Sequence, residues 1–317
     1  MTRAMTRKLP IILVLLLALM PPGAAPAFAA ATMARGFATP EAAADALVDA
    51  LRAGDIHAAA GILGAGSDKL LRSGDKAADK AARERFIAAY DAHHALMDRD
   101  ATHRVLVIGK NDWPLPLPIV QSGGDWRFDT AAGAQEIIDR RIGGNEIAAI
   151  RAMLAIVDAQ KLYFEMAKDS FGTGHYARRL VSRPGEYDGL YWPAEPGGTA
   201  SPLAPLVGAS AQDGYPGATV HGRAVPYHGY YFRVLEAQGP DAPGGARDYV
   251  QDGRMTGGFA VLAWPASHGV SGIMSFEIDQ DGVLFQKDLG ADTARRVARI
   301  RHYDPDVSWA RVDLTDN

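Results

Sequence analysis

The apolar residues of this chain switch from helical to strand-like spacing twice. In the first half, apolar positions recur every three or four residues as far as Tyr90 and then alternate over His103–Phe128. In the second half, helical spacing over Asn145–Lys168 is followed, after a long irregular segment, by four short strand-like segments with clear turn signals between them over Gly229–Lys287. Helices followed by a run of adjacent strands are typical of the α+β class. We therefore expect an α+β fold.

Because the pattern occurs twice, we expect two domains, at residues 37–141 and 144–317. Gly143 and Gly144 stand between them, and consecutive glycines favour a break in a helical pattern. The first domain is expected to place helices against an antiparallel meander. The second is expected to pack a long helix against four antiparallel strands. These strands are Gly229–Ala237, Gly258–Trp264, Gly272–Ile278 and Val283–Lys287.

Short-range signals mark the ends of several elements. Thr39 and Asp55 each stand before a predicted helix and are typical N-cap residues. Asp279-Gln280-Asp281-Gly282 joins the last two strands and is typical of a hairpin turn. A closing helix is expected over Asp292–His302.

The segment from Asp169 to Gly222 is rich in glycine and proline and has little periodicity. A loop of this length in a compact domain is either functional or anchored by its own side chains. Tyr187, Tyr191 and Trp192 are the aromatic residues that we expect to anchor it.

The first residues have the organisation of a secretory signal peptide. Basic residues precede the apolar run Leu9–Met20, and Ala27-Phe28-Ala29 follows as a cleavage motif. The apolar run is shorter than the roughly 20 residues that a membrane-spanning helix needs. We therefore expect residues 1–29 to be removed after Ala29, and the mature protein to be periplasmic or secreted, with no membrane span.

The mature chain would carry a formal charge of −7, because removing Arg3, Arg7 and Lys8 from the 33 basic residues leaves 30 against 37 acidic ones. Basic runs are no longer than two residues, and we expect these pairs to form solvated helix faces. The pairs include Arg140-Arg141, Arg178-Arg179 and Arg295-Arg296. Nucleic acid is not an expected partner, since a polyanion requires an extended basic surface.

The composition also limits metal and redox chemistry. The chain has no cysteine, which excludes thiol nucleophiles, zinc–thiolate sites and iron–sulfur clusters. Adjacent helical residues point about 100° apart, so His93 and His94 cannot share a ligand. We expect these two histidines, with His57 and His103, to be solvated or hydrogen-bonded. Asp279-x-Asp281-Gly282 lacks the remaining acidic ligands of a calcium loop. No metal or cofactor is expected.

Pro243–Gly258 is the densest cluster of polar and aromatic residues. In a catalytic interpretation, Asp248 and Asp252 form a carboxylate pair for acid–base hydrolysis, and Arg247 or Arg254 orients an anionic substrate. In a structural interpretation, the glycines form turns and the charges form buried ion pairs. We favour the structural interpretation.

Two further patterns bear on function. Ser271 does not fit a nucleophile elbow, because Ile273 stands where the second glycine belongs. The candidate binding residues are instead the aromatic and basic side chains of the two irregular segments. These are Tyr191, Trp192, Arg247 and Tyr249.

The first half resembles the nuclear transport factor 2 superfamily. The resemblance rests on Phe37-x-Thr39-Pro40-Glu41 at its start and on the hairpin from Trp113 to Phe128 at its end. It implies a cone-shaped α+β fold whose mouth, in many members, binds small apolar ligands.

The second half resembles the head domain of type IV pilins and pseudopilins. The similar segments are Gly229-Tyr230-Tyr231-Phe232-Arg233, Phe259-Ala260-Val261-Leu262-Ala263-Trp264-Pro265 and the hairpin Phe276–Val283. A pilin helix begins at the membrane, whereas this helix begins in mid-chain. The resemblance therefore implies the fold and not polymerisation into a pilus.

Segments along most of the chain resemble an uncharacterised exported bacterial family, domain of unknown function family number 2950. They are Arg141–Glu146, Gly189–Pro193, Gly229–Phe232, Asp252–Phe259 and Gln286–Gly290. No activity or catalytic residue follows from this resemblance.

These patterns favour an exported cell-envelope protein that acts by binding or in an assembly and has no catalytic activity. Its partner would be an envelope protein or a small ligand, held by the aromatic loops or in the mouth of the cone. The alternative is a periplasmic hydrolase that uses Asp248 and Asp252.

Overall fold

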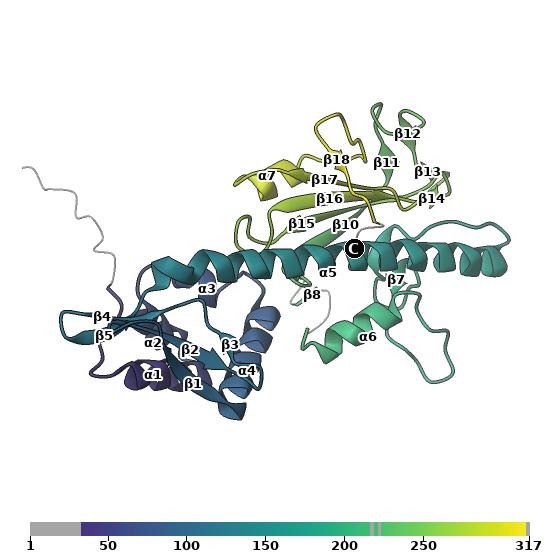
Figure 1. Cartoon of the computed structure of the whole chain (residues 1–317). Coiled ribbons are helices and arrows are strands. Elements are labelled where there is room, and N and C mark those ends of the chain that lie inside the picture. The colour runs from purple at the N-terminus through teal and green to yellow at the C-terminus, as the bar shows by residue number, and fades with distance from the viewer. Residues whose placement is uncertain (1–32, 216–218, 221–222, 315–317) are drawn as a thin grey trace, which may run out of the picture. The chain divides into compact units, whose positions relative to one another are not determined.

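The computed structural model describes residues 33–215, 219–220 and 223–314, which combine helices and sheets and confirm the α+β class (Figure 1). The expected signal peptide lies outside these residues. Of the helices that the structure describes, none has both the length and the apolar character of a membrane-spanning helix.

The N-terminal part of the described chain, residues 33–129, contains four helices and five strands. The helices are α1 (Pro40–Arg52), α2 (Ile56–Leu63), α3 (Asp68–Leu71) and α4 (Lys76–Ala92). The strands are β1 (His94–Asp98), β2 (His103–Ile108), β3 (Trp113–Pro114), β4 (Ile119–Ser122) and β5 (Asp125–Phe128). They form one antiparallel sheet in the order β1-β2-β4-β5, with β3 paired to β2.

Local side-chain chemistry starts the helices as expected. The Thr39 hydroxyl accepts a hydrogen bond from the Ala42 amide at 3.1 Å, and the Asp55 carboxylate accepts one from the Ala58 amide at 2.9 Å. Both predicted N-caps are confirmed. Strand β1 was not expected, because most of its side chains are exposed and no apolar alternation marks it.

The helices α1, α2 and α4 pack against this sheet and enclose a core (Figure 1). Apolar residues of α1 and α2 meet the inward-facing residues of β2, β4 and β5. Members of this core include Leu47, Ile62, Leu106, Ile119 and Phe128, all of them buried. Burial of this apolar surface is the main stabilising contribution to this part.

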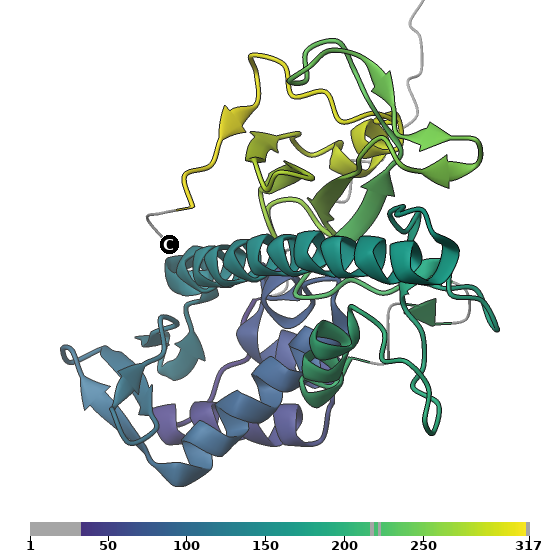
Figure 2. The ribbon, with the colours of Figure 1, turned by 90° about the vertical axis from the view of Figure 1, so that its right-hand side faces the viewer.

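A single helix, α5 (Thr130–Phe171), connects the two parts and runs without interruption (Figure 2). The expected break at Gly143-Gly144 is wrong, since both glycines lie inside the helix. Each glycine costs a helix about 1 kcal/mol relative to alanine, and tertiary packing overrides a cost of this size. Ile142 and Ala149, on either side of the pair, are buried.

The two glycines therefore give a prediction about stability. Apart from the neighbouring residues and the backbone of the helix itself, no atom lies within 4 Å of a Cβ built at Gly143 or Gly144. Gly143→Ala and Gly144→Ala should each raise the free energy of unfolding by about 1 kcal/mol, measured by denaturant titration. Gly133→Ala is the control and should lower the free energy of unfolding, because its Cβ would lie 1.8 Å from the Pro116 carbonyl oxygen. A loss of stability at both central positions would contradict the packing described.

The C-terminal part, residues 172–314, is built around a second sheet. Its helices are α6 (Ala204–Gln212) and α7 (Thr293–Val297). Its strands are β6 (Arg179–Val181), β7 (Gly189–Tyr191), β8 (Thr219–Val220), β9 (Arg223–Ala224), β10 (Tyr230–Leu235), β11 (Ala237–Gln238), β12 (Arg247–Asp248), β13 (Val250–Gln251), β14 (Arg254–Met255), β15 (Ala260–Pro265), β16 (Met274–Asp279), β17 (Leu284–Asp288) and β18 (Ala310–Arg311).

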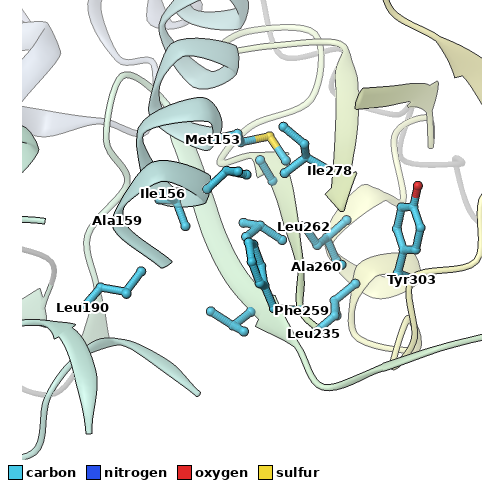
Figure 3. Close-up of a cluster of buried hydrophobic side chains, with 14 of the residues drawn as sticks. Met153, Ile156, Ala159, Leu190, Leu235, Phe259, Ala260, Leu262, Ile278 and Tyr303 are labelled. Carbon is cyan, nitrogen blue, oxygen red and sulfur yellow. The ribbon is translucent and has the colours of Figure 1, made fainter. Parts of the chain in front are cut away.

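The main sheet of this part is antiparallel, in the order β10-β15-β16-β17-β18. The four expected strands are present, and β18 adds a fifth at the edge. One face packs against α5, where Met153 lies beside Ile278 (Figure 3). Tyr303 lies on the other face, because its hydroxyl reaches Asp279, whose side chain points away from that of Ile278. The closing helix is shorter than expected and ends at Val297.

The irregular segment after α5 is more ordered than its sequence indicates, since it contains β6, β7 and α6. The expected aromatic anchoring is present. The Trp192 indole donates to the Thr199 carbonyl at 2.9 Å, and its ring meets Tyr187 edge-on at 5.0 Å. Tyr191 packs against the second core.

The two cores occupy different stretches of the chain, and α5 contributes to both. Ile137 packs against the N-terminal core, and the residues from Ala149 onward belong to the C-terminal one. Separate folding of residues 37–141 and 144–317 stays a prediction.

Candidate functional site

The two candidate carboxylates of the Pro243–Gly258 segment lie on different elements. Asp248 lies on β12 and Asp252 lies in the turn between β13 and β14, and both side chains are exposed. Asp252 and Gly253 have φ angles of 49° and 78°, the conformation of a two-residue hairpin turn. The turn thus accounts for the position of Asp252, and a hydrolytic role of Asp248 and Asp252 stays a prediction.

The other residues of this segment are partly structural. The buried Tyr249 hydroxyl and the Arg247 guanidinium both donate to the Gln238 side-chain oxygen, at 2.9 and 3.0 Å. Tyr249 is therefore a core residue and is not available to a ligand. The structural interpretation expected buried ion pairs in this segment. Arg254 is instead exposed, and it has no ion-pair partner among the described residues. Its guanidinium borders a cavity.

The remaining sequence candidates have local partners. Ser271 is fully buried, and its hydroxyl donates to the Gly229 carbonyl at 3.0 Å. His268 instead lies 2.8 Å from Asp288, so no serine–histidine pair forms. Asp279 accepts from the amides of Asp281 and Val283 and closes the last hairpin.

The histidines of the N-terminal part also have local neighbours or are exposed. The His93 Nε2 atom lies 3.0 Å from a carboxylate oxygen of Asp112, and the His103 Nδ1 atom lies 2.9 Å from a carboxylate oxygen of Asp100. His94 stacks on the ring of Tyr90. Within residues 33–215, 219–220 and 223–314, no group of three or more histidine, aspartate and glutamate side chains is arranged to hold a metal ion.

The N-terminal part instead contains a cavity of about 410 Å³, which we call the apolar pocket. It lies between the helices, the strands β2 and β3, and the beginning of α5. Its walls are formed mainly by large aliphatic and aromatic side chains: Leu47, Leu51, Ile56, Leu63, Leu70, Leu71, Phe86, Ile108, Trp113, Leu115, Leu117 and Ile137. Both its volume and its lining are typical of a small-molecule site.

Helical spacing explains why these walls converge. Leu47 and Leu51 are four residues apart on α1 and present one apolar stripe. Phe86 on α4 faces the pocket from another side, and Ile108 closes it at the end of β2. The pocket is therefore the part of the core that these helices and the sheet do not fill.

One polar pair is set into the pocket wall. The Asp79 carboxylate accepts from the Ser73 amide at 3.1 Å and from the Ser73 hydroxyl at 2.7 Å. The Arg141 guanidinium donates to the carbonyls of Lys69 and Leu70. Burial raises the pKa of Asp79 and lowers the pKa of Arg141, while each charge opposes the shift of the other.

Two further arginines, Arg83 and Arg85 on α4, border the pocket. Neither has an ion-pair partner among the residues that the structure describes. Together with Arg141 they place three positive charges around the pocket against the single negative charge of Asp79. An apolar interior with a basic border suits a ligand that has an apolar body and an anionic head.

The sequence pointed to a small-ligand site in the mouth of the cone but did not identify the residues of this pocket. Its polar residues come from α4 and α5, about 60 positions apart in the chain, and only the tertiary fold brings them together. The expectation that Arg140-Arg141 forms a solvated helix face is wrong for Arg141, which is half-buried at the pocket wall. It holds for Arg140, which is exposed and stacks over Trp113 at 5.3 Å.

Comparison with known proteins gives a family but no activity. Residues 34–312 match the model of a family described as a protein of unknown function, DUF2950. No curated protein and no solved structure matches the chain. The resemblances to nuclear transport factor 2 and to pilin heads therefore stay predictions.

Proposed function

Since the chain belongs to the DUF2950 family, whose function is unknown, we propose from the structure that it is a cell-envelope protein that binds a small amphipathic anion in the apolar pocket. The single observation that carries the proposal is the apolar pocket itself, about 410 Å³ in volume and bordered by Arg83, Arg85 and Arg141.

The chemistry of the pocket defines the ligand class. Each methylene group moved from water to an apolar environment contributes about 0.8 kcal/mol, so the ligand's body should be a hydrocarbon chain or ring. A carboxylate, sulfonate or phosphate head can pair with exposed Arg85 while the body remains among the leucines. A neutral or cationic head would lose the stabilisation from pairing with Arg85.

The proposal also depends on fold and location. Three helices against an antiparallel sheet, with a cavity between them, support the cone-like fold expected from the sequence. The first 29 residues support export. Mass spectrometry of the protein purified from its native envelope should therefore give a mature chain that begins at or near Ala30, and an intact Met1 start would contradict this location.

Calorimetric titration with ligands of one chain length tests the head group. Decanoate should bind saturably and at least tenfold more tightly than decylammonium, with decanol between them. Affinity should also rise about tenfold for every two methylenes from hexanoate to decanoate, until the pocket is full. Equal affinity for decanoate and decylammonium would contradict an anion site, and no saturable binding would contradict the proposed function.

Two substitutions on one helix locate the binding. Ala82 and Ala88 are both exposed residues of α4, but only Ala82 borders the pocket. Ala82→Trp should obstruct the pocket and weaken decanoate binding at least tenfold. Ala88→Trp should leave it unchanged. Equal effects of the two substitutions would show that decanoate binds elsewhere.

A further inference from the structure

The C-terminal part contains a second cavity, of about 540 Å³, whose lining differs in character from that of the apolar pocket. It is bordered by the C-terminal half of α5, the β6–β7 segment and the β13–β14 hairpin. Four arginines line it, and we call it the arginine cleft: Arg178, Arg179, Arg183 and Arg254. Two carboxylates, Asp188 and Glu236, line it as well.

The carboxylates occupy some of these arginines and leave others available. Arg178 forms a two-point ion pair with Glu236, with both N–O distances 2.8 Å. Arg183 binds Asp188 at 2.7 Å and also Glu186, which lies outside the cleft. Arg179 contacts the same Asp188 oxygen through its Nε, at 3.2 Å. A guanidinium has five N–H donors, so this contact leaves Arg179 further donors for a ligand.

Arg254 is the most available of the four. Its side chain is exposed, and in the described part of the chain it has no ion-pair partner. Its backbone is nevertheless fixed. The hairpin turn precedes it, and the next residue, Met255, is fully buried and accepts a hydrogen bond from the Tyr176 amide at 2.8 Å. Arg254 thus lines the cleft from a fixed backbone, and its guanidinium has no ion-pair partner among the described residues.

The charge of the lining contrasts with that of the whole protein. Four guanidinium groups face two carboxylates in the cleft, whereas acidic residues outnumber basic ones over the chain, 37 to 33. A concave site concentrates the field of its charges, and a guanidinium matches the planar oxygens of carboxylates and phosphates. Several guanidiniums around one cavity favour a ligand with more than one negative charge.

We propose that the arginine cleft binds a multiply charged oxyanion, a polycarboxylate or a polyphosphate, through Arg254 and Arg179. The ion pairs of Arg178 and Arg183 keep the frame of the cleft in place. This site is separate from the apolar pocket and would hold a ligand of different chemistry.

Calorimetric titration of the full mature chain with citrate and with tripolyphosphate at low ionic strength tests the proposal. At least one of them should bind with a dissociation constant well below millimolar, and the tighter one identifies carboxylate or phosphate as the preferred group. Affinity should fall as salt is added. Absence of saturable binding of both anions would overturn the proposal.

Substitutions locate the anion. Arg254→Gln should weaken binding at least tenfold, and Arg254→Lys should weaken it less, because lysine keeps the charge but not the planar pair of donors. Arg151→Gln is the matched control, since Arg151 is exposed on α5 and does not line the cleft. Equal loss in Arg254→Gln and Arg151→Gln would overturn the assignment in favour of nonspecific attraction. Unchanged melting temperatures and unchanged decanoate binding in Arg254→Gln show that the fold and the apolar pocket are intact.

Discussion

Asp75→Ala should lower the free energy of unfolding by about 3 to 5 kcal/mol, the loss of one helix cap and of two further hydrogen bonds to a buried carboxylate. Asp75 is fully buried. One carboxylate oxygen accepts from the amides of Ala77 and Ala78 at the start of α4, at 3.1 and 3.0 Å. The other accepts from the Gly229 amide at 2.8 Å and from the Tyr215 hydroxyl at 3.0 Å.

This arrangement makes Asp75 more than a cap. It joins the beginning of α4 to the segment that leads into β10, more than 150 residues later in the sequence. Burial, together with the negative charge of Asp75, raises the pKa of Tyr215, so its hydroxyl stays protonated and remains a donor. In Asp75→Ala, the Gly229 amide and the Tyr215 hydroxyl would lose the carboxylate oxygen to which they donate.

Urea titration compares three variants. Asp55→Ala is the matched control, because Asp55 caps α2 through one hydrogen bond at an exposed position, and its loss should cost about 1 kcal/mol. Tyr215→Phe removes one of the four bonds to Asp75, and also the bond that the Tyr215 hydroxyl accepts from the His228 amide, and its stability should fall between those of the other two variants. An Asp75→Ala variant no less stable than Asp55→Ala would contradict the role assigned to Asp75.

Glu277→Gln should become more stable than the unsubstituted protein as pH rises from 4.5 to 8. Glu277 is 1% exposed on β16, and burial raises its pKa to about 8. Between pH 4.5 and 8 the folded protein holds a proton that the unfolded chain releases, so the free energy of unfolding decreases as pH rises. Each pH unit corresponds to about 1.36 kcal/mol, which gives a change of about 4 to 5 kcal/mol across this window.

The surroundings of Glu277 explain its preference for the proton. Its Oε2 atom has no hydrogen-bond partner among the described residues. Asp304 and Asp306 add to the shift by repulsion, and Lys287 and an amide hydrogen bond from Asp304 reduce it without cancelling it. In its ionised form, Glu277 also interacts with three other groups around it, Arg233, Tyr249 and Tyr303. Glutamine has nearly the shape of the protonated side chain and loses no proton.

Denaturant titrations from pH 4 to 9 measure this effect. The difference in unfolding free energy between Glu277→Gln and the unsubstituted protein should increase up to about pH 8 and then level off. Glu165→Gln, at an exposed position of α5, should show no comparable dependence. A constant difference for Glu277→Gln across this range would mean that Glu277 is ionised in the folded protein.

Elements that depend on neighbouring residues were predictable from the sequence. Thr39 and Asp55 start helices through bonds to residues three positions away, and the hairpin at Asp279 closes through its own carboxylate. The four expected strands of the second sheet were recognisable from the turn residues that separate them. Strand β18 was not, because two exposed residues with no apolar alternation, Ala310 and Arg311, form it.

The sites depend on residues distant in sequence, and this is why they were missed. Arg179 begins β6 and Arg178 directly precedes it, so this pair does not lie on a solvated helix, and only the fold brings it to the same cavity as Arg254. Arg254 was named as a possible anion-binding residue, but beside Asp248 and Asp252 rather than beside other arginines. Spacing within one segment cannot show that segments so far apart border one cavity.

Methyl NMR spectra recorded during a decanoate titration test the central claim most directly. The claim predicts saturable shifts for methyl groups that line the apolar pocket, such as those of Leu47, Ile108 and Ile137, with no comparable shifts at Met153 and Ile278 in the other core. Unshifted pocket methyls at saturating decanoate, or shifts confined to Met153 and Ile278, would contradict binding in the apolar pocket.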